Sequence, residues 1–264
     1  MKIETVIFDM DGVIYRGEKA IPGAKEAVRA LEKAGKEVFF LTNNGSRTRG
    51  YFAKKLASFG IKAPLERVYC TSYGAAKYMS ENMPGSTAYV LEEDTEDEFT
   101  GAGIRCVHDE KADAVVVGLD RNLTYRKLSI AFRALMGGAE FIATNDDPKY
   151  PVEDGFLPGA GAIVASLAYS TGKRPLVIGK PEPYMLDLIV KEHGVRKERS
   201  LMVGDQISTD ILMAKREGMM GALVLTGVSS RAEAMEGKIR PDFVVDSIRE
   251  MPGVIRDWES PTQR

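Results

Sequence analysis

Short, continuously apolar segments alternate with amphipathic segments along most of the 264-residue chain. Near the N-terminus, expected strands at Thr5–Phe8 and Val38–Leu41 alternate with expected helices at Ala24–Ala34 and Thr48–Phe59. Strands that are apolar throughout, rather than at every second position, are typical of parallel strands covered by helices on both faces. The sequence therefore predicts an α/β fold built on a doubly wound parallel sheet.

The same alternation returns late in the chain, and we expect it to continue the same sheet. The late strands are expected at Leu176–Ile178, Leu201–Val203 and Ala222–Leu225, and the late helices at Tyr184–His193 and Thr209–Glu217. The intervening segment has its own expected strands at Thr87–Leu91, Ala114–Val117 and Phe141–Ala143, and helices at Thr124–Met136 and Ala160–Ser170. We therefore predict a core domain of residues 1–72 and 173–264, interrupted by an inserted α/β cap domain of residues 73–172.

Composition excludes several classes of partner. The net charge is −2 and the basic residues are scattered among acidic ones, so we expect no nucleic-acid partner. No apolar stretch reaches membrane-spanning length and Met1-Lys2-Ile3-Glu4 leads directly into the first strand, so we expect no membrane partner and a cytoplasmic location. The two cysteines have no metal-binding spacing and are expected to be core thiols. We expect fraying only over residues 257–264.

Polar residues follow four of the expected strands, where open α/β sheets collect their ligands. These segments are Asp9-Met10-Asp11-Gly12, Thr42-Asn43-Asn44-Gly45, Gly179-Lys180-Pro181 and the run from Gly204 to Asp210. Each segment alone has an ordinary structural explanation: a turn, a solvated lysine, or a helix cap from Ser208 or Asp210. The structural explanations predict no common order, whereas the four segments together form an ordered set.

That ordered set, Asp-x-Asp, Thr-Asn, Lys and Gly-Asp-x-x-x-Thr-Asp, resembles the haloacid dehalogenase-like (HAD) superfamily. The resemblance extends over Pro22-Gly23, Thr226-Gly227-Val228 and Pro241-Asp242-Phe243. Ala143-Thr144-Asn145 and Pro158-Gly159-Ala160-Gly161 are similar to subfamily IIA, the NagD-like, 4-nitrophenylphosphatase-like and phosphoglycolate phosphatase-like branch. This resemblance implies a Rossmann-like core with an α/β cap inserted between the second and third motifs.

The resemblance also implies a phosphatase that uses Mg²⁺ and an aspartyl-phosphate intermediate. Asp9 would be the nucleophile and a metal ligand, and Asp11 the general acid and base. The metal would also be held by the Asp11 carbonyl and by Asp205, with Asp210 supporting these ligands. Substrate contacts would come from Thr42, Asn43, Asn44 and Lys180 in the motifs, and from Asn145 and Tyr150 in the cap.

Other functions stay open at this point. A phosphotransferase or phosphomutase would use the same nucleophile, and a receiver-type signalling module or a phosphate-binding protein without activity are further alternatives. Gln206 and Tyr73 depart from the residues that relatives often carry. We expect the partner to be a small phosphorylated metabolite, such as phosphoglycolate, a sugar phosphate, a nucleotide or pyridoxal phosphate. A cap-mediated homodimer would fit this branch.

Overall fold

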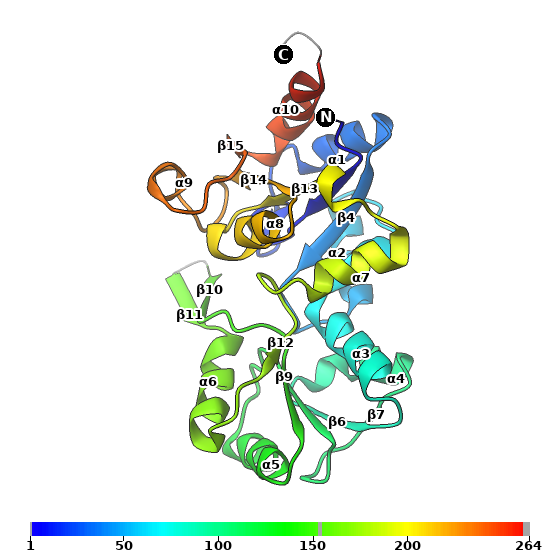
Figure 1. Cartoon of the computed structure of the whole chain (residues 1–264), viewed down its shortest axis with the longest axis vertical. Coiled ribbons are helices and arrows are strands. Elements are labelled where there is room, and N and C mark those ends of the chain that lie inside the picture. Colours follow the sequence, from blue (N-terminus) through cyan, green and yellow to red (C-terminus); the bar gives the residue numbers. More distant parts are fainter. Residues whose placement is uncertain (1, 153–154, 261–264) are drawn as a thin grey trace. The chain divides into compact units, whose positions relative to one another are not determined.

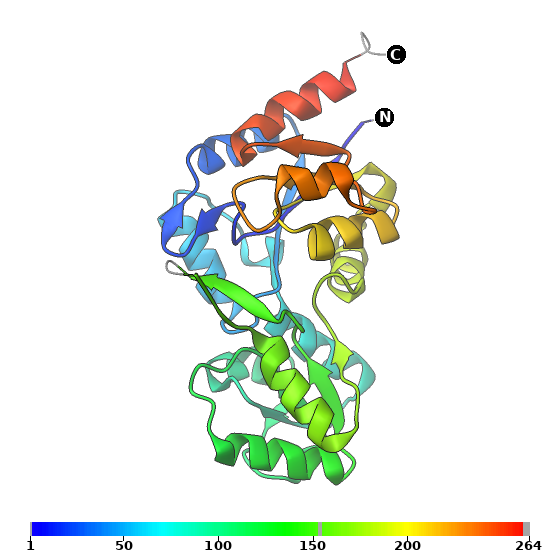
Figure 2. The same ribbon diagram turned by 90° about the vertical axis from the view of Figure 1, so that its left-hand side faces the viewer.

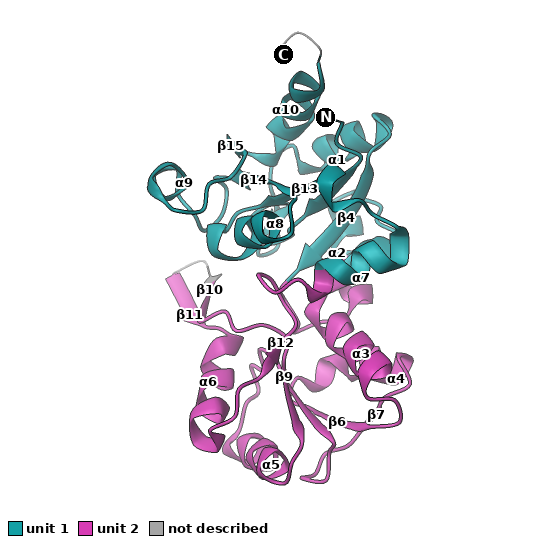
Figure 3. Cartoon of the chain, viewed as in Figure 1, with its two compact units in different colours: residues 1–42, 53–68, 186–264 teal, residues 43–52, 69–185 magenta. Residues whose placement is uncertain are grey.

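The computed structural model describes residues 2–152 and 155–260. The chain divides into two compact units (Figure 3). Unit 1 comprises residues 1–42, 53–68 and 186–264, and unit 2 comprises residues 43–52 and 69–185. Each unit is built on its own parallel sheet with helices beside it (Figure 1). The domain limits at residues 72 and 173 stay a prediction.

The first sheet has six strands in the order β15-β14-β13-β1-β4-β5. Its strands are β1 (Thr5–Phe8), β4 (Glu37–Thr42), β5 (Val68–Cys70), β13 (Ser200–Gly204), β14 (Met220–Val224) and β15 (Phe243–Val245). β1 pairs in parallel with β4 on one side and with β13 on the other. The chain winds outward from β1 in one direction and from β13 in the other, which confirms the doubly wound parallel sheet. The direction of winding therefore switches between β1 and β13.

The helices beside this sheet are α1 (Ala24–Lys33), α2 (Arg49–Ser58), α7 (Tyr184–His193), α8 (Leu212–Arg216), α9 (Arg231–Glu236) and α10 (Met251–Glu259). A small antiparallel hairpin joins β2 (Tyr15–Arg16) to β3 (Lys19–Ala20). The predicted fraying from residue 257 is wrong up to Glu259, because α10 continues to that residue. The Glu259 carboxylate accepts hydrogen bonds from Lys36 Nζ at 2.6 and 2.8 Å. Residues 261–264 of the predicted tail lie outside the described residues.

The second sheet has five strands in the order β12-β9-β8-β6-β7. Its strands are β6 (Thr87–Val90), β7 (Arg105–Cys106), β8 (Ala114–Val117), β9 (Glu140–Ala143) and β12 (Leu176–Val177). The expectation that Leu176–Ile178 continues the first sheet is wrong, because β12 pairs in parallel with β9. The apolar run alone did not distinguish the two sheets, since both contain buried parallel strands that read alike.

Helices α3 (Thr71–Asn82), α4 (Glu96–Gly101), α5 (Tyr125–Met136) and α6 (Ala160–Thr171) belong to unit 2. Helices α5 and α6 lie together over one face of the second sheet (Figure 2), and their buried side chains, such as Leu135 and Leu167, share a core with those of β8 and β9. An antiparallel hairpin, β10 (Lys149–Val152) with β11 (Gly155–Pro158), precedes α6. Among the described residues, no helix combines the length and the apolarity that a membrane crossing requires.

Candidate active site

The first and the late predicted aspartates lie next to each other at the carboxyl edge of the first sheet. Asp9 follows β1 and Asp205 follows β13, and these two strands flank the point where the winding changes direction. The Asp9 N–H continues the ladder by donating to the Val203 carbonyl at 2.9 Å. Loops that diverge from two neighbouring parallel strands leave a crevice between them, which is where open α/β sheets bind ligands. The fold therefore brings the two carboxylates to one place although 195 residues separate them along the chain.

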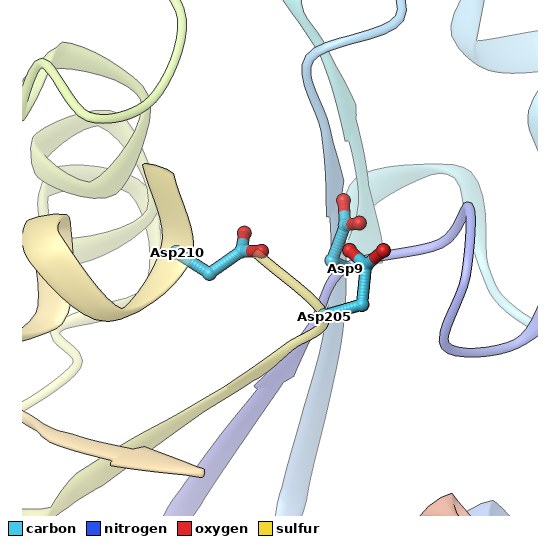
Figure 4. Close-up of side chains that lie close together, drawn as sticks. All are labelled: Asp9, Asp205 and Asp210. Atoms are coloured by element: carbon cyan, nitrogen blue, oxygen red, sulfur yellow. The ribbon is translucent and has the colours of Figure 1, made fainter. Parts of the chain in front are cut away.

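Asp210 completes a cluster of three carboxylates with Asp9 and Asp205 (Figure 4). The three side chains each offer an oxygen atom within 4.8 Å of the other two, and all three are buried. Buried carboxylates at this separation repel one another strongly unless a cation or protons neutralise them. The donor atoms are all oxygens, which hard divalent cations such as Mg²⁺ prefer. The chemistry of the cluster therefore fits a divalent cation.

The Asp205 carboxylate packs against the backbone at two glycines, Gly12 and Gly227, and these contacts were not predicted from the sequence. A Cβ atom at Gly12 would come within 2.4 Å of Asp205 Oδ2, and one at Gly227 would come within 1.7 Å of the same atom. The carboxylate also accepts a hydrogen bond from the Val228 N–H at 2.8 Å. Both glycines stand in runs that the sequence does display, Asp9-Met10-Asp11-Gly12 and Thr226-Gly227-Val228. Only the fold reveals that both runs face the same carboxylate.

Asp210 lies on a π-helical turn, Ile207–Ile211, that precedes α8. Its carboxylate accepts a hydrogen bond from the Gln206 N–H at 3.1 Å, so it also satisfies a backbone donor at the start of that turn. A Cβ atom at Gly204 would lie within 2.3 Å of Asp210 Oδ2. The helix-cap explanation is wrong for Ser208 and Asp210, because the residues at the N-caps of this turn and of α8 are Gln206 and Ile211.

Asp11 and Thr42 also belong to unit 1. The Asp11 side chain is not a member of the carboxylate cluster and is partly exposed. Asp11 forms an isolated bridge with Tyr15, and the Gly12 N–H donates to the Tyr15 carbonyl at 2.8 Å, so a tight turn fixes the backbone after Asp9. Thr42 is buried as the last residue of β4, the strand beside β1. The predicted roles of both residues stay predictions.

The other predicted residues, Asn43, Asn44, Asn145, Tyr150 and Lys180, belong to unit 2. Lys180 and Asn145 are buried. The Asn43 side chain bonds to the main chain of Lys180 in both directions, and the Asn145 side chain donates to the Asn43 carbonyl at 2.8 Å. The structure thus brings three of the five together in one hydrogen-bond network within this unit.

The remaining two residues of this group have other neighbours. The Asn44 side chain accepts hydrogen bonds from the Ser46 N–H at 3.0 Å and the Ser46 hydroxyl at 2.7 Å, which closes a local turn. Tyr150 lies on β10, and the Arg121 guanidinium stands 5.5 Å from its ring centre. This cation–π pair was not foreseen, because the two residues lie 29 positions apart and nothing in the sequence indicates the contact.

The two departures noted in the sequence have local structural partners. The Gln206 side chain donates to the Ser208 hydroxyl at 2.9 Å. The Tyr73 ring lies under the Arg49 guanidinium at 3.4 Å, and Arg49 also lies 3.8 Å from Glu98. Neither departure removes a carboxylate from the cluster.

The chain is similar to known proteins along most of its length. The family model for haloacid dehalogenase-like hydrolases matches residues 6–105, and a HAD-hydrolase-like model matches residues 177–251. The chain is 38% identical to the 5′-nucleotidase YutF of Bacillus subtilis over 92% of this chain and 95% of the relative. It is 35% identical to the glycerol-3-phosphate phosphatase of Homo sapiens over 94% of this chain and 90% of the relative.

A solved structure has the same fold over nearly the whole chain. The p-nitrophenyl phosphatase from Archaeoglobus fulgidus superposes with a TM-score of 0.91 at 32% identity, covering 96% of this chain and all of that one. The matches thus include both halves of the first sheet and the unit between them. The chain belongs to the haloacid dehalogenase-like hydrolases, in the branch of the NagD-like and p-nitrophenyl phosphatase enzymes.

Proposed function

We propose that this protein is a Mg²⁺-dependent phosphatase that hydrolyses small phosphate monoesters, with Asp9 as the nucleophile. The observation that carries the proposal is the convergence of Asp9 and Asp205, with Asp210, in one buried carboxylate cluster. Relatives named as phosphatases and a 5′-nucleotidase support this reaction class, since the chain aligns with them over nearly its full length.

The residues that would hold the metal are Asp9 and Asp205, with the main-chain carbonyl of Asp11. Asp210, whose carboxylate accepts a hydrogen bond from the Gln206 N–H, would support these ligands. When bound, a divalent cation would act as a Lewis acid and neutralise charge on the phosphoryl group. Asp205 Oδ2 packs against the backbone at Gly12 and Gly227 and accepts a hydrogen bond from the Val228 N–H. Contacts that orient a carboxylate in this way support a metal-ligand role for Asp205.

In the proposed reaction the Asp9 carboxylate attacks phosphorus, and the bond from phosphorus to the ester oxygen breaks. Asp11 gives its proton to the departing alcohol, so the products of this step are the free alcohol and an aspartyl phosphate. A water molecule then attacks the same phosphorus while Asp11 takes its proton. Asp9 and inorganic phosphate are released, and both aspartates return to their starting states.

We propose Thr42 and Lys180 as the residues that bind the phosphoryl oxygens, through a hydroxyl donor and an ammonium group. Their chemistry supports this role, because the transferred group carries negative charge that positioned donors stabilise in the transition state. Asn44, Asn145 and Tyr150 are proposed as further substrate contacts. The substrate would be a small phosphorylated metabolite, and we place the protein in the cytoplasm. A cap-mediated homodimer remains part of the proposal.

The experiment measures inorganic phosphate released from a panel of esters: a sugar phosphate, a nucleoside monophosphate, phosphoglycolate, pyridoxal phosphate and p-nitrophenyl phosphate. Each ester is assayed with Mg²⁺ and with a chelator, and without any acceptor other than water. Phosphate release that requires Mg²⁺ supports the phosphatase. Phosphoryl transfer that occurs only when a sugar is added as acceptor would instead support the phosphotransferase alternative. Failure to turn over any of the esters would refute the proposal.

A further inference from the structure

The loop that carries Lys180 is held by a side chain rather than by the sheet. Strand β12 ends at Val177, and its ladder stops where the Ile178 N–H donates to the Ala143 carbonyl at 2.9 Å. Beyond that point, the Lys180 N–H donates to Asn43 Oδ1 at 2.8 Å and the Lys180 carbonyl accepts from Asn43 Nδ2 at 2.9 Å. One side-chain amide thus supplies the acceptor and the donor that a neighbouring strand would supply.

Asn43 is itself fixed from two other segments of unit 2. Its carbonyl accepts hydrogen bonds from the Thr71 hydroxyl at 2.9 Å and from Asn145 Nδ2 at 2.8 Å. Its Nδ2 atom also lies 3.3 Å from Asp147 Oδ2. Because both the main chain and the side chain of Asn43 are bonded, the amide has a single orientation in which it serves the main chain of Lys180.

The approach between these segments is too close for a side chain at the residue before the lysine. A Cβ atom at Gly179 would lie 2.8 Å from Asn43 Oδ1 and 2.8 Å from the Thr144 carbonyl oxygen. Contacts under 3.0 Å force one of the neighbours to move, and here a main-chain atom and a bonded amide are the neighbours. Gly179 is therefore needed for Asn43 to reach Lys180.

We propose that Asn43 is a positioning residue that fixes Lys180 through its main chain and acts on the reaction through that lysine. The inference rests on the proposed function, in which Lys180 binds the phosphoryl group. It replaces the expectation that the Asn43 side-chain amide contacts the phosphate directly. A lysine ammonium sits on a flexible stem, so the position of its main chain sets where the charge can reach. A displacement of about 1 Å is enough to lower a rate by about 10²-fold.

The first test needs no enzymatic activity. Amide hydrogen exchange of the peptide around Lys180 is measured in the wild type, in Asn43→Ala and in Gly179→Ala, which keeps both Asn43 and Lys180. Each variant is expected to speed exchange of the Lys180 amide by about 10-fold, the effect of losing one hydrogen bond. The matched control is Asn82→Ala, which loses a bond of the same kind and length, from Nδ2 to the Tyr78 carbonyl at 2.9 Å, at the end of α3. Unchanged protection of Lys180 in both test variants would overturn the proposal.

The second test separates positioning from direct contact with the phosphate. The ratio kcat/KM for p-nitrophenyl phosphate is measured in the wild type, Asn43→Ala, Lys180→Met and the double variant. We expect Asn43→Ala to lower kcat/KM by about 10–100-fold in the wild-type background. In the Lys180→Met background we expect less than about a threefold further loss, because the two residues act as a unit. An equal loss in both backgrounds would show that Asn43 acts independently of Lys180.

The two proposals fail in different ways. A wild type that releases no phosphate, with Lys180 protection that depends on Asn43, refutes the proposed function and leaves the anchoring of the lysine established. Full activity in Asn43→Ala, with the wild type active and dependent on Lys180, refutes the positioning role alone.

Discussion

The Asp205 carboxylate lies directly against the backbone at Gly12, so that a Cβ atom there would come within 2.4 Å of Oδ2. A Cβ atom at Gly227 would lie still closer to the same oxygen, at 1.7 Å. A side chain at either glycine would displace this carboxylate, and the Val228 N–H donates a hydrogen bond to the same oxygen at 2.8 Å. The orientation of this carboxylate is therefore set by main chain from two separate parts of the sequence.

Gly227→Ala is expected to displace the Asp205 carboxylate and to weaken Mg²⁺ activation by about 10–100-fold, the usual effect of disturbing the support of a metal ligand. The backbone at Gly227 does not have a positive φ, so the effect is steric. The Mg²⁺ concentration for half-maximal phosphate release measures it. Gly101→Ala is the control, because the added methyl group would meet no atom within 4 Å beyond the neighbouring residues and backbone of its own helix. Unchanged Mg²⁺ dependence in Gly227→Ala would remove Asp205 from the metal site.

Glu259→Ala is expected to lower the free energy of unfolding by about 2–4 kcal/mol, because it leaves the Lys36 ammonium without its carboxylate partner. The Lys36 side chain is only 4% exposed, and beyond Glu259 its Nζ donates to the Ile3 carbonyl at 2.7 Å. Urea unfolding measures the change. In the control Asp257→Ala, a pair that is more than half exposed is lost, and the change should stay within about 0.5 kcal/mol. Equal effects of the two substitutions would contradict the account of Lys36.

The Glu92 carboxyl gives unit 2 a pH-dependent stability. Burial, together with the neighbouring carboxylates Asp120 and Asp94, raises the pKa of Glu92 from 4.5 to about 7. Between these two values the unfolded chain loses the proton while the folded chain keeps it. The contribution of this group to stability therefore falls as the pH rises from 4.5 to 7, and stays lowered above pH 7.

Glu92→Gln is expected to raise the free energy of unfolding by about 1–3 kcal/mol at pH 8 and to have no effect near pH 4, where the carboxyl is protonated in both states. Urea unfolding of both proteins at the two pH values measures the difference. Glu110→Gln, the same substitution at an exposed carboxyl, is the matched control. A stabilisation of the same size at both pH values would rule out titration as its cause.

Cys70 is expected to resist alkylation in the folded protein. The Cys70 thiol is fully buried, and burial raises its pKa to about 12, so almost none of it is thiolate at pH 8. Iodoacetamide labelling followed by mass spectrometry, in buffer and in urea, measures its reactivity. Labelling of Cys70 in buffer at the rate found in urea would contradict this burial.

The sequence predicted those parts of the fold in which local pattern and burial agree. The strands at Thr5–Phe8 and Ala114–Val117 occur at the predicted residues, because every residue of each is buried and each reads as an apolar run. The hairpin of β10 and β11 was not predicted, since Gly155–Pro158 is exposed along its length and shows no alternation. Leu176–Ile178 was assigned to the wrong sheet, because strand pairing depends on distant residues.

For the site, the order of the motifs predicted which aspartates meet, because strand ends on one sheet share an edge. The support of these aspartates could not be predicted, since it depends on close approaches of main chain such as those of Gly12 and Gly227 to Asp205. The bonds between Asn43 and Lys180 were also missed, because 137 positions separate the two residues and each has an ordinary explanation by itself.

Covalent trapping tests the central claim most directly. Asp11→Asn, which removes the proposed acid and base, is mixed with Mg²⁺ and p-nitrophenyl phosphate, whose leaving group can depart without a proton from Asp11. The mixture is quenched in acid, and the phosphorylated peptide is located by mass spectrometry. We predict a phosphoryl group on Asp9 that forms with Mg²⁺, fails to form with a chelator, and is absent when Asp9→Asn is added to the same variant. A phosphoryl group on another residue would contradict the account. So would phosphate release by the single variant Asp9→Asn, in which Asp11 is unchanged.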